Sequence, residues 1–169
     1  MRTKSRMVPE PKDRPPEAEK FIADEVDDFL RLISRDDDLV PETLRFHLIT
    51  ENQINRLVSR ALPRGEVLVR DARLRYPQKL KVLESLGFKD LAAVQALTAL
   101  NTVRNACVHD RHRVVTQDDV QSIGSPLGDQ FKSLRASHGD SLKTLTLQVY
   151  AAIFGRLSSA VYRVEHPTD

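Results

Sequence analysis

Apolar residues recur at helical spacing along most of the chain. In residues 17–35 they stand at i, i+4, i+7 and i+11, the spacing of one face of an amphipathic helix. These positions are Ile22, Val26, Phe29 and Ile33. Broad apolar faces of the same period follow in residues 41–62, 91–108 and 141–164, and no stretch alternates as a half-buried strand does. The pattern predicts an all-α protein, an up-and-down bundle of four or five main helices.

Residues that start and stop helices mark the ends of these segments. Pro41 suits the first turn of the second helix, and Pro63 follows its last turn. A shorter helix is expected over residues 76–86, and Asp90 is placed to cap the helix after it. Residues 66–75 fit either a short extended piece or a helical turn.

Two further boundaries lie in the C-terminal third. Thr116, with Asp119 three residues later, resembles a capping box and predicts a short helix there. Gly124-Ser125-Pro126 ends that helix. Residues 137–140 are interpreted as a loop or cap before the last helix.

Composition separates a tail from one helical domain. Residues 1–16 hold four prolines and five bases and have little to bury, so we expect a disordered tail there. Residues 17–165 are expected to form a single domain, followed by a short tail at 166–169. Apolar runs are too short to span a membrane, and no apolar segment follows the N-terminal bases. We therefore predict a cytoplasmic protein.

Several polar residues stand where the helical pattern expects apolar ones. Arg104 lies in the middle of the apolar face of the third long helix, and His47, Glu51 and Asn55 lie within that of the second. A guanidinium stays charged, so burying it without a partner is costly. One hypothesis is a buried Arg104–Glu51 ion pair, with Asn55 or Asn101 completing the hydrogen bonds. His47 and Glu51, one turn apart, are expected to share a hydrogen bond rather than a metal ion.

Charge is unevenly distributed, although the net charge is only +2. Residues 16–40 contain nine acids and three bases, whereas residues 56–81 contain eight bases and two acids. A basic block can hold phosphates. It is more often a solvated surface, or it faces an acidic helix of its own chain. The sequence leaves the role of residues 56–81 open.

A short motif closes the most apolar helix. Residues 104–109 read Arg-Asn-Ala-Cys-Val-His, which has the form R-N-x-x-x-H, and the segment before them contains KLKVLESLGF and LTALN. Over residues 46–110 the chain resembles the HEPN superfamily of small helical-bundle proteins. The same segment is similar to that of mannitol-operon-repressor-like proteins.

The HEPN resemblance implies metal-independent RNA cleavage at a site completed by dimerisation. Arg104, Asn105 and His109 are then the catalytic residues: the guanidinium stabilises phosphoryl charge, the amide orients the phosphate or imidazole, and the imidazole moves protons. Arg111 and Arg113 are candidates for contacts to flanking phosphates. The expected product is a 2′,3′-cyclic phosphate. The expected partners are RNA, a second copy of the chain, and an antitoxin or regulatory protein.

Helix geometry limits how this motif can work. His109 lies about 140° from Arg104 around one continuous helix. The two meet only if the helix ends near Val108, or if a second subunit supplies one of them. The alternative function is a non-catalytic transcriptional regulator or protein-interaction module of mannitol-repressor-like type, with Arg104 paired to Glu51. No metal or cofactor is predicted, because the sequence has neither metal-site spacing nor a glycine-rich phosphate loop.

Overall fold

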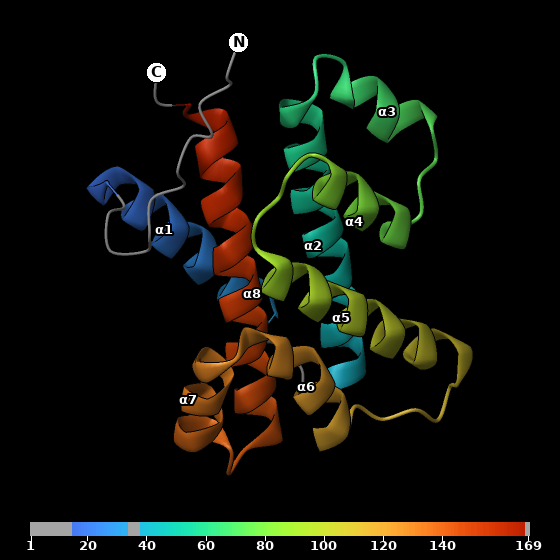
Figure 1. The fold of residues 1–169 in the computed structure, drawn as a ribbon. Coiled ribbons are helices and arrows are strands. Elements are labelled where there is room, and N and C mark those ends of the chain that lie inside the picture. The colour runs from blue at the N-terminus through green and yellow to red at the C-terminus, as the bar shows by residue number, and fades with distance from the viewer. Residues whose placement is uncertain (1–14, 34–37, 168–169) are drawn as a thin grey trace.

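Every regular element in the described chain is helical (Figure 1). The computed structural model describes residues 15–33 and 38–167, and it confirms the predicted all-α bundle. None of the described helices combines the length and apolar content needed to cross a bilayer. The elements are α1 (Pro16–Ile33), α2 (Leu39–Ala61), α3 (Gly65–Asp71), α4 (Tyr76–Ser85), α5 (Leu91–His109), α6 (Gln117–Gly124), the 3₁₀ turn η2 (Ser125–Leu127), α7 (Asp129–His138) and α8 (Leu142–Glu165).

The C-terminal helix α8 forms the centre of the bundle, and it packs against α1, α2, α5, α6 and α7. Its Tyr150 is fully buried and stacks on Phe46 of α2 with ring centroids 4.1 Å apart. The Tyr150 hydroxyl lies 2.8 Å from the Thr43 hydroxyl, so its polar end is also satisfied. Phe154 stacks on Phe29 of α1 at 4.9 Å. Stacked Phe and Tyr rings of three helices thus form the aromatic part of the core in a chain that has no tryptophan.

Helix α5 carries the motif and is anchored at its start. The Asp90 carboxylate accepts the Ala93 N–H at 3.0 Å, as the predicted cap requires. The same carboxylate binds Arg156 of α8 at 2.9 and 3.0 Å. From this anchor α5 runs across α2 (Figure 1) and stays helical through His109. The contacts of Asp90 at the start of α5 therefore help to place the motif, which lies at the other end of the same helix.

The predicted helix ends that fall on described residues agree with the structure to within two residues, whereas the predicted end of the first helix at residue 35 lies outside them. Thr116 caps α6 in a capping box with Asp119, as expected. The ambiguous segment 66–75 contributes most of α3. Helix α7 was not predicted, because Phe131 is its only described residue that is fully buried and the apolar pattern there is weak. The predicted tail, residues 1–16, lies almost entirely outside the described residues.

Two large apolar residues of the long helices are exposed. Leu48 of α2 is 57% exposed and Val108 of α5 is 51% exposed. The helices that the structure describes therefore leave part of the apolar face of α2 and of α5 uncovered. Cys107, in contrast, is buried, and burial raises the pKa of its thiol. It is a core residue rather than a reactive one.

Gly65 is required where α3 folds back onto α2. A Cβ at this position would overlap the Val58 carbonyl oxygen and lie 2.7 Å from Ser59 Cα. Because both obstacles are backbone, Gly65→Ala should lower the free energy of unfolding by about 2–3 kcal/mol, measured by urea denaturation. Gly155→Ala is the control, since its Cβ would meet only side chains at 3.6 Å or more. A loss of equal size in both variants would contradict this packing.

Candidate functional site

Helices α2, α4 and α5 meet around a group of polar side chains, here called the polar cluster. Most of its contacts link one helix to another, and they are buried or part-buried. Its members are His47, Thr50, Glu51, Tyr76, Lys79, Asn101 and Arg104.

His47 joins the three helices. Its residue is only 4% exposed, and the Nε2–H donates to Asn101 Oδ1 of α5 at 3.1 Å. The imidazole stacks on Tyr76 of α4 with ring centroids 4.0 Å apart. The Tyr76 hydroxyl lies 2.8 Å from the Thr50 hydroxyl of α2. The expected His47–Glu51 hydrogen bond is not formed, because the ring points toward α4 and α5.

Burial keeps His47 neutral. It lowers the pKa of the imidazole, and the cations Arg104 and Lys79 lower it further against the opposing effects of Asn101 and Glu51. The Nδ1 atom is buried and accepts no hydrogen bond from any described residue. The neutral, Nε2-protonated form fits both observations.

Glu51 is neutralised by Lys79, not by Arg104. The Lys79 ammonium lies 2.7 Å from Glu51 Oε1, and the two side chains are 9% and 27% exposed. The predicted Arg104–Glu51 pair is therefore wrong. Lys79 belongs to the basic segment 56–81, but the packing of α4 on α2 turns it inward. A buried lysine needs a carboxylate, and Glu51 is within reach.

Arg104 consequently keeps most of its donors free. It is half-buried, and its Nη1 donates to Asn105 Oδ1 at 3.0 Å. Within the described residues no carboxylate lies within 4 Å of its guanidinium. A guanidinium has five N–H donors, and one weak neighbour leaves several for an incoming anion. The structure brings Arg104 and Asn105 together as predicted.

His109 is not brought to the same place. It is the last residue of α5 and is exposed. Because α5 does not break before it, His109 and Arg104 point about 140° apart. Within one chain the two side chains do not face a common point.

The two arginines after the motif differ in their surroundings. Arg111 is exposed in the turn that follows α5. Arg113 binds both carboxylate oxygens of Asp119 through Nη2, at 2.6 and 2.8 Å. Asp119 also accepts the Thr116 N–H, so this ion pair holds the turn against α6. It competes with the phosphate contact predicted for Arg113.

Sequence reasoning missed three members of the cluster and included one residue outside it. Thr50, Tyr76 and Lys79 were not singled out, because nothing in the sequence says that α4 packs beside His47. Tyr76 lies at the start of the helix expected over residues 76–86, but nothing around it in the sequence indicates a partner on α2. Asn55 is separate: its buried Oδ1 has no partner among the described residues.

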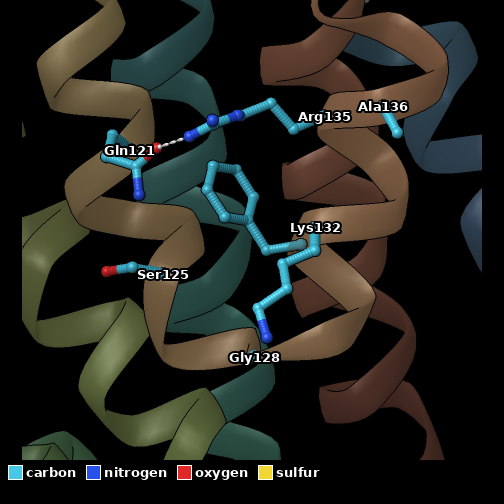
Figure 2. Close-up of a pocket in the computed structure, with 7 residues that line it drawn as sticks. Gln121, Ser125, Gly128, Lys132, Arg135 and Ala136 are labelled. Atoms are coloured by element: carbon cyan, nitrogen blue, oxygen red, sulfur yellow. Dashed lines mark hydrogen bonds between the residues drawn. The ribbon is translucent and has the colours of Figure 1, made fainter.

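A surface cavity of about 600 Å³ lies elsewhere, between α6 and α7. Arg135 reaches across its mouth from α7 to Gln121 of α6 at 2.9 Å (Figure 2). Lys132, its other cation, binds Asp129 at 2.8 Å. Lys132 is thus paired with a carboxylate and Arg135 with an amide oxygen, and Arg104 does not line this cavity. Among the described residues, no three His, Cys, Asp or Glu side chains gather as a metal site requires.

Comparison of the chain with models of known families, with curated proteins and with solved structures finds no match. The HEPN and mannitol-repressor resemblances therefore stay predictions. What the site can do has to be inferred from its geometry.

The neutral state of His47 predicts a loss of stability in acid. Its pKa in the folded protein lies below the ordinary 6.5, so the unfolded chain binds the proton more tightly. The stability that comes from keeping His47 neutral is present above about pH 6.5 and is lost as the pH falls below this value. Between about pH 7.5 and pH 5.5, wild type should lose up to about 1.4 kcal/mol more than His47→Gln in urea denaturation. An identical pH dependence in both proteins would show that His47 is not buried neutral.

The ion-pair assignment predicts unequal effects of removing the two cations. Lys79→Met should lower the free energy of unfolding by about 3 kcal/mol, because it leaves Glu51 without its partner. Adding Glu51→Gln should recover most of that loss. Arg104→Met should cost less than about 1 kcal/mol, since no carboxylate depends on it. Thermal and urea unfolding measure all three, and a larger loss from Arg104→Met than from Lys79→Met would reverse the assignment.

Proposed function

We propose that the protein is a metal-independent endoribonuclease of HEPN type, in which Arg104 and Asn105 bind the scissile phosphate. One observation carries the proposal: the Arg104 guanidinium is rooted in an apolar helix face, is half-exposed and has no carboxylate partner among the described residues. Had Arg104 been paired with Glu51, the structural role would have accounted for it. Because Glu51 is paired with Lys79 instead, that explanation does not apply to Arg104.

His109 supplies the proton transfers in this proposal. The ribose 2′-oxygen attacks phosphorus, forming the P–O2′ bond while the P–O5′ bond breaks. An imidazole takes the 2′-hydroxyl proton or protonates the departing 5′-oxygen. Arg104 stabilises the charge that builds on the phosphoryl oxygens, and Asn105 holds the guanidinium in place. The products are a 2′,3′-cyclic phosphate and a 5′-hydroxyl.

A second copy completes the site, because the two residues diverge on one helix. The imidazole then comes from His109 of one protomer and the guanidinium from Arg104 of the other. Val108 supports this arrangement: it lies one turn beyond Arg104 on the same face and is 51% exposed. A half-exposed valine beside a free cation is a surface that another chain can cover.

A non-catalytic regulator or protein-interaction module is the competing function. The exposed apolar side chains Leu48, Val108 and Val114 favour it, because such residues also mark binding sites for other proteins. An antitoxin or regulatory protein would be the partner. In that case the protein leaves several different RNAs intact, and Arg104 serves recognition rather than cleavage.

Cleavage of RNA in EDTA tests the proposal. Wild type should form products ending in a 2′,3′-cyclic phosphate, and His109→Ala should reduce the rate by at least about 100-fold, as expected for loss of a general acid–base. Arg104→Gln should be impaired to a similar degree. Capillary electrophoresis of labelled RNA, with acid treatment to open the cyclic phosphate, measures both.

Mixing the two inactive variants tests the shared site. If each site takes Arg104 from one protomer and His109 from the other, a heterodimer of Arg104→Gln and His109→Ala contains one intact site. Random exchange then restores about a quarter of wild-type activity. No recovery would contradict the two-subunit arrangement, whereas an inert wild type would contradict the nuclease itself.

A further inference from the structure

The basic segment 56–81 divides into paired and unpaired residues. Four of its eight bases bind carboxylates of their own chain: Arg56, Arg70, Lys79 and Lys81. The other four are exposed, and among the described residues they pair with none: Arg60, Arg64, Arg73 and Arg75. The acidic helix α1 does not account for them. Among the described residues, the one ion pair between α1 and this segment joins Glu25 to Arg56 at 3.7 Å.

Arg73 and Arg75 occupy the turn between α3 and α4, beside the candidate site. Arg75 directly precedes Tyr76, whose ring stacks on His47. His47 in turn binds Asn101, which lies one helical turn before Arg104. In Figure 1 the chain enters α4 on the same side of the molecule as the C-terminal half of α5. Tyr76, His47 and Asn101 thus connect the start of α4 to the half of α5 that carries Arg104.

Neither position suits an arginine on grounds of stability. Arg73 has φ +48°, a left-handed conformation that favours glycine. Arg75 is the N-cap of α4, and its N–H donates to Gln78 Oε1 at 2.8 Å. Serine at this position would complete a capping box with Gln78, whereas an arginine side chain has no acceptor to offer. Local backbone preference therefore explains neither residue, which leaves their charge to be accounted for.

We propose that Arg73 and Arg75 bind backbone phosphates of a single-stranded RNA that continues onto Arg104. Guanidinium groups are well matched to phosphate oxygens. The turn itself contains no exposed large apolar side chain, which a docked protein would need at the core of its interface. The contact at Arg104 rests on the proposed function, but binding at the turn does not require cleavage.

The test is a double variant that removes both charges and improves the backbone. Arg73→Gly with Arg75→Ser should keep or raise stability in urea, yet bind RNA more weakly. In a His109→Ala background, fluorescence anisotropy with a labelled single-stranded oligouridylate should show roughly twentyfold weaker binding at about 0.1 M salt. The slope of log affinity against log salt should fall by about 1.4, or 0.7 for each lost phosphate.

A matched control removes two charges elsewhere. Arg60→Gln with Arg64→Gln makes the same change in net charge at the far end of α3 and should bind RNA nearly as wild type does. Equal weakening by both doubles would mean that only net charge matters, and unchanged affinity in Arg73→Gly/Arg75→Ser would overturn the proposal. Self-association that this double variant abolishes would instead make the turn a protein contact.

The same titrations separate this inference from the nuclease. If only Arg104→Gln weakens binding, the turn is not part of the site and the proposed function stands. If the turn variants weaken binding but wild-type protein never cleaves RNA, the surface stands and the nuclease does not. A wild type that does not bind the oligouridylate overturns the RNA surface.

Discussion

The ion pair between Glu51 and Lys79 decides the character of the α2–α4–α5 junction. It joins two side chains that the sequence placed in different categories, a misplaced acid on an apolar face and a surface base. With Glu51 neutralised from α4, nothing on α2 competes for Arg104. The arginine can then stay half-exposed with its donors unsatisfied, which is the condition for binding an anion.

The stacked pair His47 and Tyr76 gives this arrangement its rigidity. A charged imidazole would repel Arg104 and Lys79, and burial prevents that by lowering the pKa of His47. The neutral ring can pack against Tyr76 and still donate to Asn101. Hydrogen-bonded networks of this kind hold helices in one relative position. The guanidinium of Arg104 is thus carried on a helix whose placement is fixed at both ends.

In the turn before α4, two residues are not the ones that local backbone stability favours. Local preference would place glycine at position 73 and serine at position 75, and the chain has arginine at both. Conflicts between local preference and sequence are expected at functional surfaces, where selection acts on something other than stability. The proposed contacts of Arg73 and Arg75 with RNA phosphates would account for that conflict.

The sequence by itself determined the long helices, the shorter helices α4 and α6, and most of their ends, but neither α3 nor α7. Apolar spacing of about 3.6 residues and the caps at Asp90 and Thr116 are local properties, so they could be interpreted without knowing what packs where. Only the tertiary structure decided the partners. Glu51 and Lys79 are 28 residues apart in sequence, and their pairing depends on α4 lying against α2. Likewise, Val108 is exposed because none of the helices that the structure describes covers that part of α5. Side-chain pairing is set by long-range packing, which periodicity along one helix does not encode.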